Sequence, residues 1–318
     1  MSIEDQQERF EELRRQIREL RRASRRQGVD MSDEIEELEE RLEEEQAEAY
    51  SGLSRYDRVK LARHQERPFT LDYVDALCDD WVELHGDRAF RDDPSIVGGW
   101  ATFDGRSVMI IGQQKGRNME ENLERNFGSP HPEGYRKAAR LMKLAEKFGK
   151  PVVTLVDTQG AYPGIGAEER GQGEAIARNL FLMSGLRTPI VTCVIGEGGS
   201  GGALGIAVAD RVLMLENAIY SVISPEGCAA ILWRSRDQAE QAAEALKLTA
   251  TDLLELDVID EIVPEPTAGA HTAPGETADA LAEALARHLD ELEGIDPDEL
   301  VERRREKYYE MGEWEEPA

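Results

Sequence analysis

The strongest structural signal in the chain is Gly196-Glu197-Gly198-Gly199-Ser200-Gly201-Gly202, which stands between two apolar runs, residues 189–195 and 203–209. The first run is short and β-branched and predicts a buried strand; the second predicts a buried helix. Glycine lowers stability wherever its freedom is not needed, so five glycines in seven positions indicate a functional turn in which the backbone takes positive φ and approaches a ligand closely. A strand, a turn and a helix start leave free N–H groups at one spot, which favours an anion or a developing oxyanion.

Several short motifs overlap in this stretch, and the residues alone leave their chemistry open. Residues 196–201 fit the dinucleotide fingerprint G-x-G-x-x-G, with Glu216 placed downstream as a ribose-binding acid. Residues 198–202 fit the G-x-S-x-G elbow of a serine hydrolase, with His271 or His288 as a base. A P-loop is excluded because Gly-Lys-Ser/Thr is absent. The remaining chemistry is that of the backbone, whose N–H groups can stabilise an enolate or another oxyanion.

A second glycine-containing loop follows another predicted strand. The apolar run 152–156 leads into Asp157 to Gly164, and a long helix is expected over 168–184. Strands and helices alternate from about 95 to 225, after a hairpin joined across Asp104-Gly105. This order predicts an α/β domain with largely parallel strands and with ligands at the strand carboxyl ends. The two glycine loops are therefore expected to be neighbours and to build one site.

Helices are expected on both sides of this region. A helix that starts at Thr70 is predicted to carry Trp81 on its apolar face and to end at His85-Gly86. Near the N-terminus two thin apolar stripes, broken at Gly28 and at an expected N-cap at Ser32-Asp33, predict a helical hairpin that packs on the domain or on a partner. Residues 258–264 predict a short edge segment, and a final amphipathic helix carries three leucines: Leu281, Leu285 and Leu289.

Composition restricts the class of protein. The chain has 318 residues, is 40% hydrophobic and carries a formal net charge of −27, which argues against nucleic acid as the main ligand. It contains no apolar stretch long enough for a membrane span, and its acidic N-terminus does not resemble a signal peptide, so we expect a cytoplasmic protein. Its three cysteines are far apart and form no C-x-x-C, which predicts neither a zinc site nor a disulfide framework.

Several long motifs, in the same order, closely resemble the α-subunit family of bacterial acetyl-CoA carboxylase carboxyltransferases. The motifs cover residues 112–117, 126–128, 132–138, 157–172, 195–204, 220–228 and 264–271. The resemblance runs over about 55–275 and more loosely to both ends.

This resemblance implies an α/β fold of the crotonase/ClpP-like type, a superhelix of ββα units with an N-terminal helical hairpin and C-terminal helices. We therefore expect an N-terminal helical extension over 1–66, a crotonase-like carboxyltransferase domain over 67–266 and a C-terminal helical segment over 267–318.

The resemblance also implies the reaction and the partners. The chain would transfer the carboxyl group of carboxybiotin to acetyl-CoA, giving malonyl-CoA in the first step of fatty acid biosynthesis. It would be active only with a β subunit, as an α2β2 assembly, and in this family that subunit carries the zinc ribbon and most of the coenzyme A contacts. Carboxybiotin would be presented by the biotin carboxyl carrier protein, and ATP would be consumed by the separate biotin carboxylase. No metal is expected in this chain.

The family assigns the biotin side of the site to α-subunit glycines, which here are Gly201 and Gly202. Their backbone N–H groups would form an oxyanion hole for biotin, and Ser200 would serve the turn rather than attack a substrate. By adjacency, the further expected substrate-binding residues are Gly160, Ala161, Gly199 and Arg170. Arg170 has an equally plain alternative as an ordinary helix salt bridge.

One residue departs from the family motif, because Gln159 stands where the family has proline. Glutamine frees a backbone N–H and relaxes φ, so the turn is expected to be looser or to admit a polar side chain to the site. Two other classes remain open at this point: a hydrolase or other crotonase-type enzyme that acts alone, and a purely structural partner.

Overall fold

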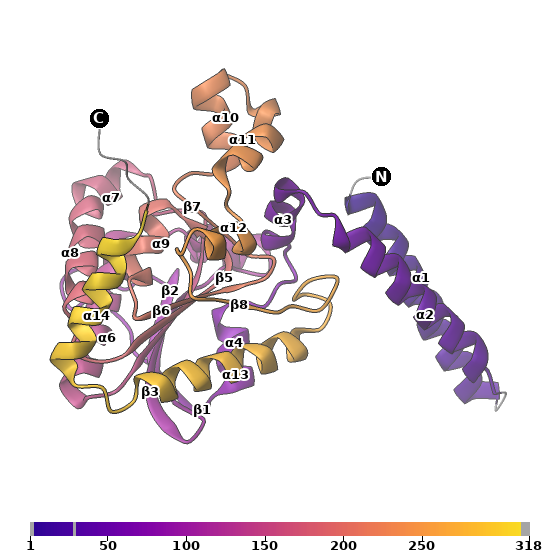
Figure 1. The fold of residues 1–318 in the computed structure, drawn as a ribbon, viewed down its shortest axis with the longest axis horizontal. Helices are drawn as coiled ribbons and strands as arrows, with labels where there is room; N and C mark the ends of the chain where they lie inside the picture. The colour runs from indigo at the N-terminus through magenta and orange to yellow at the C-terminus, as the bar shows by residue number, and fades with distance from the viewer. Residues whose placement is uncertain (1–2, 28–29, 313–318) are drawn as a thin grey trace.

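A mixed eight-stranded sheet forms the centre of the molecule (Figure 1), in the computed structural model, which describes residues 3–27 and 30–312. The strand order is β1-β2-β3-β4-β5-β6-β8, and β7 pairs with β5. The strands are β1 (Asp79–Glu83), β2 (Ile96–Phe103), β3 (Arg106–Gln113), β4 (Val152–Thr158), β5 (Ile190–Gly199), β6 (Arg211–Leu215), β7 (Ile219–Ser221) and β8 (Glu261–Val263).

Helices cover the sheet and both ends of the chain. They are α1 (Ile3–Gln27), α2 (Ser32–Ser51), α3 (Arg55–Ala62), α4 (Thr70–Leu77), α5 (Met119–Glu124), α6 (Pro132–Phe148), α7 (Ile165–Glu169), α8 (Gln172–Ser184), α9 (Ser200–Ala207), α10 (Pro225–Trp233), α11 (Ala239–Leu246), α12 (Ala250–Glu255), α13 (Pro274–Leu292) and α14 (Pro297–Glu310). Helices α6, α8 and α9 pack together on the sheet, whereas α13 packs with α4 and contacts β5 and β8.

The strand directions bring the chain segments that follow β4 and β5 to the same end of the parallel strands. The β2–β3 hairpin is antiparallel and turns through Asp104 and Gly105, whose φ values of 47° and 71° are those of a type I′ turn, so this prediction is confirmed. Strands β3 to β6 are parallel, and every residue of β4 is buried. The carboxyl ends of β4 and β5 therefore lie side by side, and β8 is an edge strand as predicted.

The helix predicted from Thr70 to beyond Trp81 is too long. Helix α4 ends at Leu77, and the next residues form strand β1, in which Val82 pairs with Trp100 of β2. A run this short does not separate helical from extended periodicity, and pairing with β2 satisfies the backbone of the extended form. The helix predicted over 168–184 is likewise divided into α7 and α8, because Gly171 takes a φ of 82° between them.

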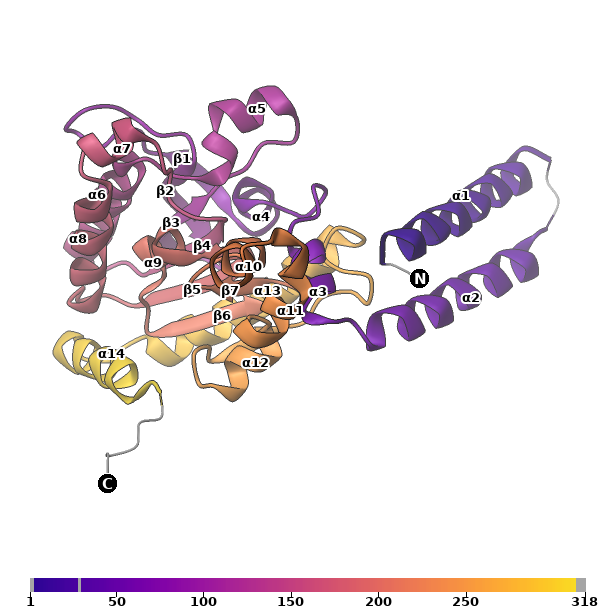
Figure 2. The same cartoon turned by 90° about the horizontal axis from the view of Figure 1, so that it is seen from above.

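The N-terminal hairpin projects away from the body of the molecule (Figure 2). At its base Phe10 packs against Tyr50, with ring centroids 6.0 Å apart, and both belong to a small buried cluster with Leu61 and Ala268. The expected N-cap is displaced by one residue, since Met31 precedes α2 and Ser32 is its first residue. The expected break at Gly28 lies outside the described residues.

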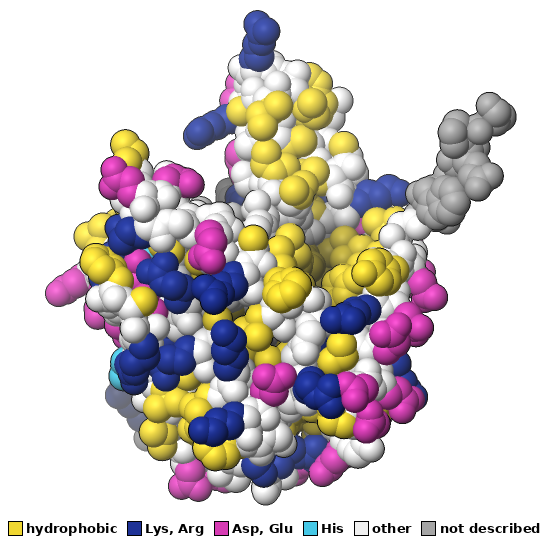
Figure 3. Space-filling model, turned by 90° about the vertical axis from the view of Figure 1, so that its left-hand side faces the viewer, with side chains coloured by type: hydrophobic (Ala, Val, Ile, Leu, Met, Phe, Trp, Pro, Cys, Tyr) yellow, Lys and Arg dark blue, Asp and Glu magenta, His cyan; other side chains and the backbone are white. Residues whose placement is uncertain are grey.

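The surface is uneven in charge and apolar content. In Figure 3, Lys and Arg side chains gather on the face where α6, α8 and α14 lie, although the chain as a whole is strongly acidic. Hydrophobic side chains lie on and below the projecting α10 and α11, where Val222, Ile231 and Leu232 are exposed. Among the described helices, none combines the length and apolarity that crossing a bilayer requires.

Candidate functional site

The two glycine segments meet at the carboxyl ends of β4 and β5. We call residues 159–164 the β4 loop and residues 196–202 the β5–α9 junction. A Cβ atom added to Gly199 would lie closer than 3.0 Å to the backbone of Gln159. One added to Gly202 would lie closer than 3.0 Å to the backbone of Gly160 and Ala161. The prediction that the two segments are neighbours is confirmed.

The junction is not the glycine turn that its composition predicted. Strand β5 continues to Gly199 and α9 begins at Ser200, so regular structure takes up the whole stretch. The positive φ expected of its glycines is absent in the structure, and the residue with positive φ is Ser200, at 53°. The prediction was wrong about why glycine is required: at most of these positions glycine permits close packing rather than an unusual backbone conformation.

The crowding around the junction comes from elements distant in sequence. A Cβ at Gly196 would collide with the carboxylate of Asp157, and one at Gly198 would collide with the ring of Tyr220. Gly201 differs, because the nearest atom to its added Cβ is a side-chain carbon of Ile176 at 3.8 Å.

The start of α9 has the polarity of an anion site. Gly199 occupies the N-cap position and provides no side-chain hydrogen bond to the first turn of α9. The first N–H groups of a helix lack carbonyl partners within it, and the helix dipole favours negative charge at that end. Gly160 lies opposite with a φ of 151°, and its N–H donates to the hydroxyl of Thr158 over 3.1 Å.

A buried ion cluster joins the strands beneath the two segments. Lys115, two residues after β3, places its Nζ 2.7 Å from a carboxylate oxygen of Asp157 and 3.3 Å from one of Glu197. The backbone N–H of Glu197 donates to the same Asp157 oxygen over 3.0 Å. Arg63 continues the cluster, 2.7 Å from Glu197 and 2.7 Å from Glu226 at the start of α10.

The charges in this cluster stabilise one another. Burial alone would lower the pKa of Lys115, but Asp157 and Glu197 raise it above its ordinary value. Burial alone would raise the pKa of Glu197, but Lys115 and Arg63 hold it below its ordinary value. The Lys115 ammonium and the Glu197 carboxylate are therefore charged at neutral pH, and the ion pairs of Lys115 with Glu197 and Asp157 fix the ends of β4 and β5 relative to each other.

Lys115 lies in the family motif of residues 112–117 but was not assigned to the site from the sequence. The available signal was the register of three parallel strands, each of which ends near a charged residue: Lys115, Asp157 and Glu197.

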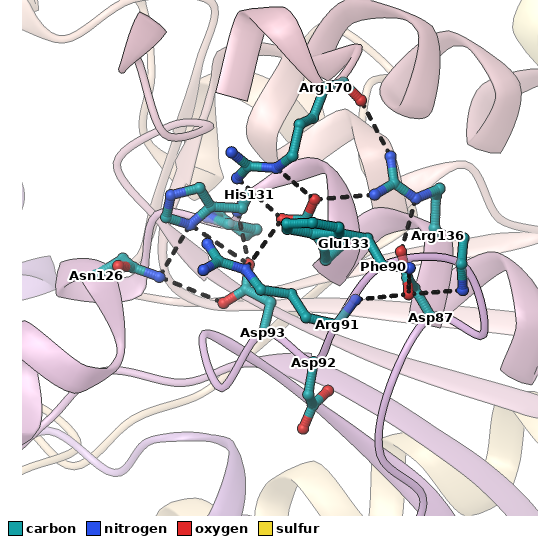
Figure 4. Close-up of polar contacts among 12 residues, drawn as sticks. Asp87, Phe90, Arg91, Asp92, Asp93, Asn126, His131, Glu133, Arg136 and Arg170 are labelled. Carbon is teal, nitrogen blue, oxygen red and sulfur yellow. Dashed lines mark hydrogen bonds and ion pairs between the residues drawn. The ribbon is translucent and has the colours of Figure 1, made fainter. Parts of the chain in front are cut away.

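Arg170 is engaged by a buried carboxylate (Figure 4). Its guanidinium donates to Glu133 at 2.7 and 3.2 Å and lies 5.3 Å from the ring centre of Phe90. Glu133 is fully buried and also accepts from Arg136 at 2.9 Å, while Arg136 donates to Asp87 at 2.8 Å. Arg170 thus forms a salt bridge that anchors the chain just after the β4 loop and α7.

Gln159 is exposed, and its amide nitrogen lies 3.5 Å from the hydroxyl of Ser129. Its side chain is therefore directed toward the loop before α6, while its backbone carbonyl faces Gly199.

An apolar hollow opens beside Ser200 and Gly201. Its volume is about 300 Å³. It is lined by α9, β7 and the segments around α11 and α12, through Leu204, Tyr220, Ser221, Val222, Leu246, Leu253 and Val258.

The hydrolase alternative needs a base near Ser200, and the two candidate histidines are engaged elsewhere. His271 stacks on His64 with ring centroids 3.8 Å apart and lines a different cavity from Ser200. Burial and the neighbouring His64 lower the pKa of His271 to about 3. His288 lies 2.7 Å from a carboxylate oxygen of Glu261 on β8.

The dinucleotide alternative is also weakened, because the carboxylate of Glu216 accepts from the N–H of Glu265 over 3.3 Å at the β6–β8 edge. In the described part of the chain, no group of three or more His, Cys, Asp or Glu side chains is placed to hold a metal ion.

Comparison with known proteins gives one family. Residues 3–312 match the family described as "Acetyl co-enzyme A carboxylase carboxyltransferase-like". The chain is 56% identical over 308 residues to the acetyl-coenzyme A carboxylase carboxyl transferase subunit alpha of Gemmatimonas aurantiaca, covering 96% of each chain. It is 57% identical over 306 residues to the protein of the same name from Thermus thermophilus, covering 96% of this chain and 97% of that one.

Solved structures share the fold at low sequence identity. A chain of transcarboxylase 12S, with methylmalonyl-coenzyme A and methylmalonic acid bound, superposes with a TM-score of 0.57 at 23% identity, over 71% of this chain and 42% of that chain. A Pseudomonas malonate decarboxylase hetero-tetramer in complex with coenzyme A superposes with a TM-score of 0.56 at 18% identity, over 67% and 85%. The predicted crotonase-like fold class is confirmed.

Proposed function

This chain belongs to the acetyl co-enzyme A carboxylase carboxyltransferase-like family, and we propose that its two glycine segments hold the carboxybiotin side of the reaction. Its function is that of the carboxyl transferase subunit alpha: transfer of a carboxyl group to acetyl-CoA, which gives malonyl-CoA for fatty acid biosynthesis. The observation that carries the proposal is the contact between the β4 loop and the start of α9, which has no side-chain cap.

Within the site, the N–H groups of Gly201 and Gly202 bind the urea oxygen of biotin. Carboxybiotin supplies the carboxyl group and leaves negative charge on this oxygen as the group departs. Fixed N–H donors stabilise such charge without reorganising, and each lowers the activation barrier by about 3 kcal/mol in comparable oxyanion holes. Gly160 and Ala161 form the facing wall with their backbones, and Gly199, at the N-cap of α9, packs against the backbone of Gln159 beside them.

The other candidate residues support this wall. Arg170 anchors the end of α7 on Glu133 and thereby holds the β4 loop rather than contacting biotin directly. The hollow beside Gly201 suits the apolar rings and chain of biotin, because its volume of about 300 Å³ and its largely aliphatic lining match a small apolar group.

The partners follow from the same proposal. The carboxybiotin is carried on a biotin carboxyl carrier protein and is made by an ATP-dependent biotin carboxylase. The chain works with a β subunit that binds acetyl-CoA, in an α2β2 assembly. We place this assembly in the cytoplasm.

The proposal is tested by combining the purified chain with a carboxyltransferase β subunit and a carrier protein bearing ¹⁴C-labelled carboxybiotin. Labelled malonyl-CoA is expected from the pair and not from either subunit alone. Absence of labelled malonyl-CoA from a correctly assembled pair would contradict the proposal.

A matched variant separates this function from that of a serine hydrolase. Ser200→Gly relieves the positive φ of that residue and removes its hydroxyl. We expect the variant to retain carboxyl transfer within a few-fold. If Ser200 were a nucleophile, the variant would lose all activity, and a fluorophosphonate would label Ser200 in the wild-type protein.

A further inference from the structure

A buried glutamine amide connects the end of strand β4, just before the β4 loop, to the first turn of α9. Gln113 is the last residue of β3 and is fully buried. Its Oε1 accepts from the backbone N–H of Asp157 over 3.0 Å, just before the β4 loop. Its Nε2 donates to the backbone carbonyl of Gly202 over 2.9 Å, in the first turn of α9. One side chain therefore connects the end of β4 to the start of α9.

A second buried donor reaches the same carbonyl oxygen. The hydroxyl of Tyr135, on α6, donates to the carbonyl of Gly202 over 3.0 Å. Burial raises the pKa of Tyr135 well above its ordinary value, so the hydroxyl stays protonated and remains a donor. The backbone carbonyl of Tyr135 in turn accepts from Asn179 of α8, at 3.0 Å, and Asn179 also donates to Gly205 at 2.9 Å.

We propose that Gln113 is a positioning residue for carboxyl transfer: it fixes the distance between the β4 loop and α9, with Tyr135 as a second support for the Gly202 carbonyl. The inference rests on the proposed function, because it concerns the geometry of the same site. Gln113 does not itself contact the substrate, and it acts through the backbone of residues 157 and 202.

Glutamine is suited to this place because its amide is a donor and an acceptor at the same time. Glutamate at position 113 would offer no donor to the Gly202 carbonyl, and leucine would leave both backbone groups without their partner. Since Gly202 already lies against the backbone of Gly160 and Ala161, a small shift of α9 changes where its N–H groups point. Rates fall steeply when reacting groups are displaced by as little as about 1 Å.

The neighbouring residue provides a matched control. Gln114 is also buried, accepts from the N–H of Leu71 at 2.9 Å and donates to the carbonyl of Lys115 at 2.9 Å. Gln113→Leu and Gln114→Leu therefore each remove two hydrogen bonds made by a buried amide, but one of them alone removes the bridge between the glycine segments.

The experiment measures kcat, KM for acetyl-CoA and thermal unfolding for both variants, each assembled with the β subunit and supplied with carboxylated carrier. For Gln113→Leu we expect kcat to fall at least tenfold relative to Gln114→Leu, with KM for acetyl-CoA changed less than threefold and a similar loss of thermal stability. Tyr135→Phe removes one of the two supports, and we expect kcat to fall by two- to tenfold; this variant also tests the inference if Gln113→Leu does not fold.

The inference is overturned if Gln113→Leu keeps its kcat within twofold of that of Gln114→Leu. If Gln113→Leu does not fold, the inference is overturned when Tyr135→Phe folds and leaves kcat unchanged. An equal fall for both glutamine variants also overturns it, because that result indicates general destabilisation. These outcomes differ from failure of the proposed function, in which the wild-type assembly itself forms no malonyl-CoA.

Discussion

The β4 loop and the β5–α9 junction are both rich in glycine, but they use glycine for different purposes. In the β4 loop, Gly160 has a φ of 151° and an added Cβ would meet nothing within 4 Å. In the junction, Gly199 and Gly202 have ordinary backbone angles and leave no space for a Cβ. Glycine at the first place allows a backbone conformation, and at the second it allows two chain segments to touch.

This difference separates two kinds of sensitivity. A side chain introduced at Gly160 changes the backbone energy of one loop. A side chain introduced at Gly202 pushes apart two elements that together form the candidate site. Substitutions at the two places should therefore differ in their balance between lost stability and lost activity.

The largest effect is expected for Gly202→Ala. Its methyl group would press on the backbone of Gly160 and Ala161, which cannot rotate away as a side chain can. We expect kcat to fall more than about 100-fold, as for loss of an oxyanion-hole donor, with a loss of about 1–3 kcal/mol in stability from overpacking. Steady-state kinetics measure kcat, and urea unfolding measures the loss of stability. If this variant kept the kcat of the wild type, close packing at Gly202 would not distinguish the junction from the β4 loop.

Lys115→Met tests whether the ion cluster holds the two segments together. The variant leaves the buried carboxylates of Asp157 and Glu197 facing each other without their shared cation. Breaking a buried ion pair from one side costs about 3–5 kcal/mol, and we expect an unfolding free energy lower by that amount. Lys143→Met, an exposed lysine on α6, is the control and should change stability by less than about 0.5 kcal/mol.

Gly160→Ala is expected to act mainly on the backbone. A φ of 151° belongs to a region that is almost restricted to glycine, and occupying it with alanine costs about 1–3 kcal/mol. We expect a lower unfolding temperature and a smaller fall in kcat than for Gly202→Ala. A larger fall in kcat than at position 202 would reverse the ranking of the two segments.

The junction should also confer acid sensitivity through Glu197. Because its carboxylate has a lowered pKa in the folded state, it stabilises the fold above its unfolded pKa of about 4.3, and that stabilisation is lost as pH falls through the folded value. Below about pH 4.3 we expect Glu197→Gln to lose stability less steeply than the wild type, by up to about 1.4 kcal/mol per pH unit. Urea unfolding between pH 3 and pH 6 measures this slope; parallel profiles would contradict the assignment.

The smallest effect is expected for Gly201→Ala. This junction glycine has room for a methyl group, 3.8 Å from Ile176, and alanine keeps the backbone N–H that the proposed oxyanion hole uses. We expect unchanged or slightly higher stability, since alanine favours a helix over glycine, and a much smaller fall in kcat than for Gly202→Ala, because the methyl group enters only the hollow that Gly201 lines. A loss comparable to that of Gly202→Ala would show that crowding is not what distinguishes these positions.

Local sequence signals predicted the parts of the fold that depend on local chemistry. The Asp104-Gly105 turn and the apolar run of β4 carry their structure in adjacent residues. Strand β1 was missed because Asp79–Glu83 becomes extended through pairing with β2, which no pattern within five residues reveals. Gly171 divides the long helix by its backbone angle, which its identity alone does not specify.

The same limit applies to the candidate site. The meeting of the two glycine segments followed from the order of parallel strands and was predicted. The reason that the junction requires glycine was not predicted, because the atoms that crowd these glycines belong to residues far away in sequence, such as Gln159, Asp157 and Tyr220. Lys115 and Gln113 were missed for the same reason, since their partners lie on other strands and on α9.

The projecting N-terminal hairpin has a hydrodynamic consequence. Helix α1 has 25 residues and is therefore about 37 Å long at 1.5 Å per residue, and its packing against the body is concentrated near Phe10 and Tyr50 at one end (Figure 2). Such a rod adds friction out of proportion to its mass. The isolated chain should sediment more slowly and elute earlier from a sizing column than a spherical protein of 318 residues, and its tumbling should be anisotropic.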